Sequence, residues 1–554
     1  MLTLIVPEQN SDFLPNFRRG DMIYLYSYPT DKEPDVRKSI LHKGVITEIS
    51  SAQLTIHLNN GQFREDLFPD NLCYAIEHGG SDVTSSAALA GMHQFISAPP
   101  DRKALLLGQR EPQRDDRLKL SRSYHPDYDE ILLKAKQALD YFLLVGPPGT
   151  GKTSMALRFI VEEELASPAR GDASILLMSY TNRAVDEICE MLCKAGIPFV
   201  RLGSEFSCDP QFKPFLLSQA VEDHPRLYEL QDYLRNIRVV VGTTSTMISR
   251  PFIFAIKDFS LAVIDEASQI LEPNIIGLLA AHYPGNAIAR FILIGDHKQL
   301  PAVVQQSEEE SRVDNPLLQE IGLTNCRNSL FERLIRHEHN KGRESFIGIL
   351  HRQGRMHPEI SRWPCQTFYR HERIEPVPLP HQTETSDKPR LVFIPSEKCY
   401  QPELSDKVNT SEAAIVAQEL LRVYNLYKED FDPDKTAGVI VPYRNQIAMI
   451  RKEIERLGIK PLEQISIDTV ERYQGSQRDV IIYSFTIQHN YQLDFLTSNC
   501  FEEDGVTIDR KLNVAMTRAR RQLILTGNEQ TLRHNPLFAG LLDFIREKGC
   551  YKTI

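Results

Sequence analysis

A glycine-rich stretch directly after an apolar run constrains the fold of this chain more than any other feature. The segment "GPPGTGKT", residues 146–153, follows "YFLLV" and precedes the helix-forming run "SMALRFIVEEEL". A strand, a glycine-rich loop and a helix in this order form a phosphate-binding loop, because glycines let backbone N–H groups surround phosphates at a helix N-terminus. A coincidental glycine turn would not explain both flanking elements. The sequence therefore predicts a nucleotide-binding α/β domain.

We expect the whole loop to contact the nucleotide, and two of its residues to have particular roles. Lys152 would reach the β- and γ-phosphates, and the hydroxyl of Thr153 would bind Mg²⁺. The loop therefore predicts a nucleoside triphosphate bound with Mg²⁺. The predicted nucleotide-binding residues of the loop are Gly146, Pro147, Pro148, Gly149, Thr150, Gly151, Lys152, Thr153 and Ser154.

The segment "LAVIDEAS" supplies the acidic partners of the loop. Its four apolar residues place Asp265 at the end of a strand, where it would hold Mg²⁺ through water. Glu266 would orient or deprotonate the attacking water. Many strands end in a carboxylate, but the combination with an upstream phosphate loop in one α/β domain is specific.

The composition limits the classes of protein that this chain can represent. It has 554 residues, enough for several domains, and its net charge of -10 excludes a generally basic nucleic-acid or membrane-surface protein. Its nine cysteines are scattered, and Cys189 and Cys193 have no second pair that would complete a zinc site. We therefore expect a reducing compartment: the cytoplasm, or the nucleoid or nucleus. No basic leader and no apolar window of about 20 residues is visible, so no membrane contact is expected.

Short apolar strands alternate with amphipathic helices from residue 141 onward, and this alternation restarts after about residue 370. The pattern predicts two tandem α/β domains with parallel sheets. The expected divisions are a small β-barrel-like region at 1–83, a helical stalk at 84–140, a first α/β domain at 141–345 with a helical insert at 205–237, a second at 346–535, and a C-terminal helix or tail at 536–554.

The order of the remaining motifs resembles that of superfamily 1 helicases, and most of all the group with the nonsense-mediated-decay RNA helicase and the replication helicase–nuclease. The resemblance covers about residues 141–530. It implies two RecA-like domains with the ATP site at their junction. The motifs that carry it are "SYTNRAVDEI", "VVGTTSTM", "FILIGDHKQLPAVV", "LHRQGRMHPEI", "VPYRNQ", "ISIDTVERYQGSQRDVIIYSFT" and "LNVAMTRARRQLILTGN".

The resemblance implies further residues around the γ-phosphate. Gln299 would sense the γ-phosphate or its water, and Arg355 and Arg518 would close on it from the second domain. Gly475 and Gln477 would face the nucleotide. The catalytic set is then Lys152, Asp265, Glu266, Gln299, Arg355 and Arg518. For either arginine alone, a structural ion pair is the alternative.

The resemblance also implies a path for a single strand across both domains. Hydroxyl and amide side chains at helix starts suit phosphate contacts, which position a strand without reading its sequence. Helix capping is the alternative for these polar residues, and an ordinary aromatic at a helix start is the alternative for the tyrosine. The predicted contacts are Thr181, Asn182, Thr243, Thr244, Tyr443 and Thr469.

The chain departs from the family where the base would bind. The family often has a tyrosine before the arginine, and here Gly354 stands in that place. Gln137 lies too close to the phosphate loop to be the usual adenine-reading glutamine, and Gln477 replaces a frequent glutamate. We therefore expect loose recognition of the base.

The leading hypothesis is an ATP-dependent motor on single-stranded DNA or RNA, with DNA slightly favoured, and the resemblance implies that it moves 5′ to 3′. One alternative is a nucleic-acid-gated switch that signals to a partner without unwinding, and another is a signalling NTPase without nucleic acid. No nuclease motif and no cysteine set for an iron–sulfur cluster is visible. The chain is then either the motor part of a larger protein or a partner of a separate nuclease or another genome-maintenance protein. We also expect a monomer.

Overall fold

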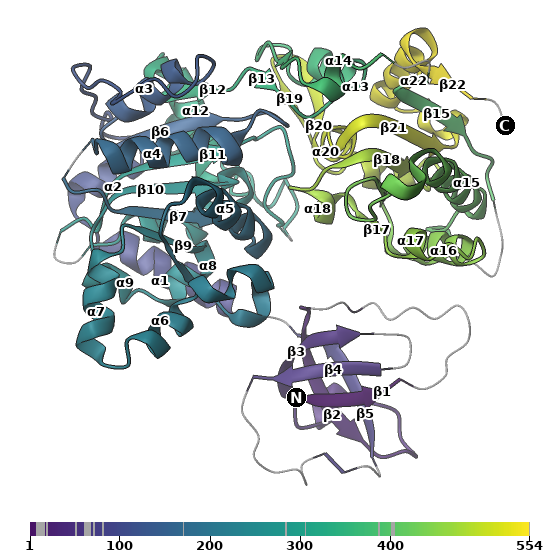
Figure 1. The fold of residues 1–554 in the computed structure, drawn as a ribbon, viewed down its shortest axis with the longest axis horizontal. Helices are drawn as coiled ribbons and strands as arrows, with labels where there is room; N and C mark the ends of the chain where they lie inside the picture. Colours follow the sequence, from purple (N-terminus) through teal and green to yellow (C-terminus); the bar gives the residue numbers. More distant parts are fainter. Residues whose placement is uncertain are drawn as a thin grey trace.

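A computed structural model of the chain describes residues 1–6, 17, 20–49, 53–59, 68–69, 72–79, 82–169, 171–282, 285–304, 306–385, 388–399 and 405–552. Two α/β domains stand side by side, and a smaller antiparallel sheet lies beneath them (Figure 1). Among these residues, none of the helices is long and apolar enough to cross a membrane.

The first α/β domain is built on a seven-stranded sheet in which every neighbouring pair is parallel. Most of its strands are buried at every position, as apolar strands covered on both faces should be. In order across the sheet, the strands are β12 (Ile347–Ile349), β6 (Tyr141–Val145), β11 (Ile288–Gly295), β10 (Phe259–Asp265), β7 (Ile175–Ser179), β9 (Val239–Thr243) and β8 (Val200–Leu202).

Helices cover both faces of this sheet. One face packs against α3 (Asp129–Gln137), α4 (Arg158–Ala166) and α5 (Asn182–Ala195). The other packs against α1 (Asp82–Ser97), α2 (Pro100–Leu106), α8 (Thr244–Ser249), α10 (Ile276–Leu279) and α12 (Leu330–Asn340). Residues 84–140, where we expect a stalk, thus lie against the first domain. Residues 205–237, the expected insert, hold η4 (Glu205–Ser207), η5 (Pro210–Phe215), α6 (Leu217–Asp223) and α7 (Leu227–Asn236).

The second α/β domain repeats this architecture with six parallel strands: β17 (Ser466–Thr469), β16 (Ala437–Val441), β18 (Arg478–Ser484), β21 (Ala519–Gly527), β15 (Leu391–Pro395) and β22 (Cys550–Tyr551). Its helices include α13 (Pro358–Thr367), α15 (Thr410–Tyr427), α16 (Arg444–Glu455), α18 (Val470–Tyr473), α20 (Arg510–Met516) and α22 (Pro536–Lys548). The last strand, β22, pairs with β15 in a region for which we expect only a helix or tail.

The N-terminal region forms a five-stranded antiparallel sheet of order β1 (Leu2–Ile5), β4 (Gln53–Leu58), β3 (His42–Ile49), β2 (Met22–Tyr28) and β5 (Cys73–His78). Its closure into a barrel stays a prediction. The sheet contacts both α/β domains. The ring of His57 contacts that of Phe206 of the first domain in a tilted arrangement with ring centroids 4.4 Å apart, and Asp21 lies 3.6 Å from Arg472 of the second.

A hairpin projects from the second domain between β18 and α20. Strands β19 (Cys500–Glu503) and β20 (Val506–Asp509) pair in antiparallel register. Asp504 and Gly505 form the turn between them with φ values of +51° and +74°. Two positive φ values suit a two-residue hairpin turn, and an Asp-Gly pair adopts them readily.

Candidate active site between the two α/β domains

The phosphate loop begins where β6 ends and runs into the helical turn η3 (Lys152–Leu157). Gly149 and Gly151 have φ values of +77° and +73°, which strongly favour glycine. A Cβ at Gly149 would lie 2.5 Å from the Cβ of Arg355, and a Cβ at Gly146 would overlap the side chain of Lys152. The loop is therefore a close-fitting cradle that only glycine can form, and its backbone suits a polyphosphate.

The residues predicted to bind Mg²⁺ lie together at the rim of this cradle. The Thr153 hydroxyl donates to Oδ2 of Asp265 at 2.6 Å, and Lys152 Nζ donates to the Gly146 carbonyl at 2.7 Å. A hydroxyl and a carboxylate are the hard oxygen ligands that Mg²⁺ prefers. The side chains present therefore fit a magnesium–nucleotide complex.

Two adjacent carboxylates follow β10. Burial, together with the negative charge of Glu266, raises the pKa of Asp265 to about 6 against the hydrogen bond from Thr153. A divalent cation would relieve this charge. Glu266 adopts a φ of +54°, which is costly for a residue with a side chain and is common at functional sites. Gln269 Nε2 donates to Glu266 Oε2 at 2.9 Å and fixes its direction.

Two guanidinium groups from the second domain face this site. Arg518 is buried and its Nη2 donates to Oε1 of Gln299 across the junction at 2.7 Å. Arg355 Nε donates to Oε1 of Gln477 at 3.0 Å. Burial lowers the pKa of Arg518 to about 9, and repulsion from Arg355 contributes. Within the described part of the chain neither arginine forms an ion pair, so the alternative of a structural ion pair does not fit the geometry.

Sequence reasoning missed a third carboxylate in the cleft. Glu187 lies on α5, and a Cβ at Gly475 of the second domain would lie 3.5 Å from its Oε1. Burial raises the pKa of Glu187 to about 7; Arg183 and Arg355 oppose the shift, and Asp265 adds to it. Gly475 itself has a φ of +80°. The signal in the sequence was weak, because Glu187 is one polar position on an amphipathic helix.

The predicted strand-contacting residues of the first domain follow two neighbouring strands, β7 and β9. Thr181 accepts a hydrogen bond from Ala184 N at 3.2 Å, and Thr243 accepts one from Thr246 N at 3.1 Å. Both threonines therefore cap helices, as the alternative interpretation holds. Thr244 is buried, whereas Asn182 is exposed and accessible to a ligand.

The predicted contacts of the second domain lie at the ends of neighbouring strands β16 and β17. Tyr443 and Thr469 line one hollow of about 600 Å³. Tyr443 is mostly buried and stacks on Phe495 with ring centroids 4.9 Å apart, so it behaves as an aromatic at a helix start. Sequence reasoning missed the basic residues around this hollow, which are Lys407, Arg444 and Arg472.

Known proteins match both α/β domains. Two family models described as AAA domains match residues 126–238 with 226–307, and residues 326–530. The DNA replication ATP-dependent helicase/nuclease JHS1 of Arabidopsis thaliana is 30% identical over 452 residues, which is 77% of this chain. Regulator of nonsense transcripts 1 of Dictyostelium discoideum is 27% identical over 460 residues, 74% of this chain. The chain belongs to the superfamily 1 helicases.

This helicase chain spans less than half of those two relatives: 30% of the Arabidopsis protein and 31% of the Dictyostelium protein. Among solved structures, an arterivirus nonstructural protein 10 (helicase) in complex with DNA is similar at 16% identity and a TM-score of 0.37. That similarity covers 75% of this chain and 65% of the viral chain.

The base end of this helicase site differs from its phosphate end. Gln137 is buried, and its Nε2 donates to the carbonyls of Asp116 and Leu118 at 3.2 and 3.1 Å, so it does not face a base. The hydroxyl of Tyr128 is not available to a base either. It donates to the Thr150 carbonyl at 2.9 Å and so supports the phosphate loop. Gly354 has no side chain and offers no aromatic platform.

Proposed function

We propose that this chain couples ATP hydrolysis at the domain junction to movement along a single strand of nucleic acid, with DNA favoured over RNA. The hydrogen bond between Arg518 and Gln299 carries the proposal. It joins the two domains beside the predicted γ-phosphate site. Hydrolysis would therefore change the contact that holds the domains together, and domain motion would follow the chemistry.

Each cleft residue has one role in this proposal. Lys152 and the loop bind the phosphates, and Thr153 with Asp265 would hold Mg²⁺, which neutralises phosphate charge when bound. Glu266 orients or deprotonates the attacking water. Arg355 and Arg518 stabilise the charge that develops on the transferred phosphoryl group.

The strand would lie across the ends of β7 and β9 in the first domain and of β16 and β17 in the second. The exposed Asn182 and the hollow beside Thr469, whose lining includes Lys407 and Arg444 besides two carboxylates, support this path. We assign a 5′-to-3′ direction from family membership. A monomer suffices, because both halves of the cleft come from one chain. The helicase/nuclease name of the Arabidopsis relative makes a nuclease or another genome-maintenance protein the proposed partner.

Steady-state hydrolysis with matched DNA and RNA oligonucleotides tests the proposal. We expect strong stimulation by a single strand, with more by DNA, and loss of hydrolysis in Lys152→Ala. Duplexes with a 5′ or a 3′ single-stranded tail then test movement, and only the 5′ tail should allow displacement. Stimulated hydrolysis without displacement from either tail would favour a nucleic-acid-gated switch, and hydrolysis indifferent to any strand would contradict both.

A further inference from the structure

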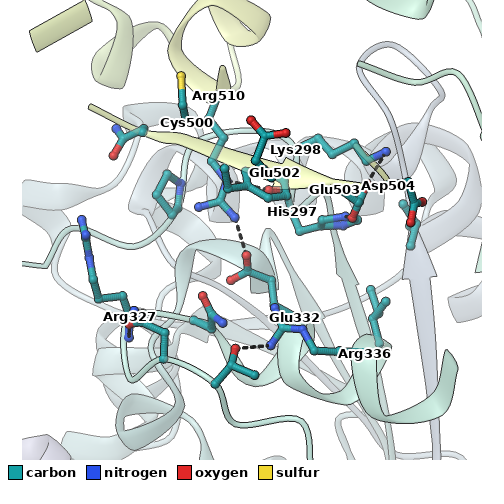
Figure 2. A pocket seen from close by; sticks show the side chains of 18 of the residues that line it. His297, Lys298, Arg327, Glu332, Arg336, Cys500, Glu502, Glu503, Asp504 and Arg510 are labelled. Carbon is teal, nitrogen blue, oxygen red and sulfur yellow. Dashed lines mark hydrogen bonds and ion pairs between the residues drawn. The ribbon is translucent and has the colours of Figure 1, made fainter. Parts of the chain in front are cut away.

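The β19–β20 hairpin crosses from the second domain to the first beside a large cavity. This cavity has a volume of about 1070 Å³, and both domains line it. Figure 2 shows the hairpin residues above and the α12 residues below the hollow. Because the hollow separates much of the hairpin from the first domain, polar contacts rather than a continuous apolar interface hold it in place.

Glu503 makes the main contact of the hairpin with the first domain. Its Oε1 accepts a hydrogen bond from His297 Nε2 at 2.7 Å, and its Oε2 lies 2.6 Å from Lys298 Nζ. Burial alone would raise the pKa of Glu503, but hydrogen bonds from His297 and Lys298 and their charge lower it to about 2. Glu503 is therefore a carboxylate at every pH at which the enzyme would be assayed.

The two residues that Glu503 binds are held from other directions as well. Lys298 is almost fully buried, and its Nζ also lies 2.7 Å from Oε1 of Glu372 in the second domain. Arg510, which follows the hairpin, donates from Nε to the His297 carbonyl at 2.8 Å and pairs with Glu332 of α12 (Figure 2). Second-domain charges thus surround one turn of the first domain.

That turn carries the glutamine predicted to sense the γ-phosphate. Gln299 directly follows Lys298, and its Nε2 donates to Asp296 Oδ2 at 2.7 Å. Its Oε1 accepts from Arg518 at 2.7 Å. The backbone N–H of Lys298 donates to the same Asp296 carboxylate at 3.0 Å. Displacement of Lys298 would therefore move both Gln299 and its contact with Arg518.

We propose that Glu503 is a positioning residue: from the hairpin it grips His297 and Lys298 and thereby holds the 296–299 turn, with Gln299, against Arg518. This inference rests on the proposed ATPase function. Glu503 contacts none of the predicted nucleotide-binding residues directly. Its loss should therefore lower the fraction of molecules in the closed, hydrolysing arrangement without weakening nucleotide binding.

The test compares Glu503→Ala and Glu503→Gln with the unmodified chain in strand-stimulated ATP hydrolysis at saturating strand. We expect kcat to fall about tenfold in both variants while KM for ATP stays within about twofold, as loss of a closing interaction predicts. Glutamine keeps the volume of glutamate but not its charge. Recovery of kcat in Glu503→Gln would show that the hairpin only fills space and would overturn the proposal.

Glu502→Ala is the matched control, because Glu502 is exposed on the same hairpin and bonds within it to Thr507. It should retain the unmodified kcat. If the unmodified chain hydrolyses ATP and Glu503→Ala is equally active, this inference is wrong but the proposed function stands. An unmodified chain without ATPase activity overturns the proposed function together with it.

Discussion

At the scale of single residues, the reacting end of the site is defined by two arginines that lack a carboxylate partner among the described residues. Burial and mutual repulsion lower the pKa of Arg518, and burial lowers that of Arg355, with Glu187 and Glu266 opposing. Two like charges that face one site are unfavourable by themselves. A phosphate group between them would remove that cost, so the arginines are arranged for a ligand rather than for stability.

Arg355→Ala should separate nucleotide binding from hydrolysis. We expect ATP binding to remain within a few-fold of the unmodified chain while strand-stimulated turnover falls by about 10³-fold or more, since an arginine of this kind acts in the transition state. Equilibrium titration and steady-state kinetics measure the two effects. Arg352→Ala is the control, because Arg352 pairs with Glu375, 2.8 Å away at the surface, and should keep its activity. Unchanged turnover in Arg355→Ala would defeat the assignment.

Base selectivity should be low. A site that hydrogen-bonds one base discriminates strongly against others, by about 10⁴ or more in favourable cases. Here Gln137 and Tyr128 make internal hydrogen bonds, and Gly354 offers no stacking surface. We therefore expect hydrolysis of ATP, GTP and CTP to agree within about tenfold at saturating strand. A strong preference for ATP would mean that another residue reads the base.

At the scale of elements, two glycines bring α1 and α10 into close contact. A Cβ at Gly277 would overlap the backbone of Gly91, which cannot move aside as a flexible side chain can. Gly277→Ala should therefore lower the free energy of unfolding by about 1–3 kcal/mol. A Cβ at Gly540 on α22 would meet no atom within 4 Å, so Gly540→Ala should raise that free energy by about 0.5–1 kcal/mol. Chemical denaturation of the two variants measures both signs.

The elements that sequence could predict are those whose pattern is local. The strand, loop and helix around Lys152 and the buried strand before Asp265 follow from apolar runs and glycines, and the structure places both as expected. The contact between Glu503 and Lys298 joins segments far apart in the chain, and no local pattern encodes it. The sequence analysis did not predict the β19–β20 hairpin, and its place against the first domain depends on how the domains pack.

Strand β22 and the position of Glu187 also depend on contacts that no local sequence pattern encodes. Strand β22 is only two residues long, so periodicity cannot reveal it, and it forms because β15 offers an unpaired edge. Glu187 faces the cleft because the apolar face of α5 is buried against the sheet, and this burial sets the direction of the opposite face. In each case the missing information is tertiary packing, which a single sequence does not display.

At the scale of the whole molecule, each α/β domain has its own apolar core, and several polar contacts link the two domains. The contacts across the junction include Arg518 with Gln299, Glu503 with Lys298, and Asn513 Nδ2 with the Lys298 carbonyl at 2.7 Å. Leu300 of the first domain also packs among apolar residues of the second domain's core. Each domain otherwise keeps its own apolar core, so closure can follow the occupancy of the site between them.

The stability of the second domain should depend on pH through Glu412. This residue is buried where β15, β18 and α15 meet, and burial raises its pKa to about 7 against hydrogen bonds from Ser484, Thr486 and Ser396. The folded state therefore holds a proton that the unfolded chain releases near pH 4.5. The contribution of this proton to the free energy of unfolding is complete below that pH. It is lost as the pH rises through the folded-state pKa, and the loss is roughly 3 kcal/mol at most. Glu412→Gln should remove this loss.

Glu419 on the same helix provides a control of opposite sign. Burial acts to raise its pKa, but Lys552 and Arg422, at 2.8 and 2.6 Å, lower it overall. Its contribution is present above the pKa of the unfolded chain and is lost as the pH falls. Relative to the unmodified chain, Glu412→Gln should therefore gain stability between about pH 4.5 and about pH 7, whereas the destabilisation of Glu419→Gln should stay nearly constant over that range and shrink only as the pH falls below about 4.5. Denaturant unfolding at several pH values measures both trends, and parallel curves for the two variants would refute the assignment of Glu412.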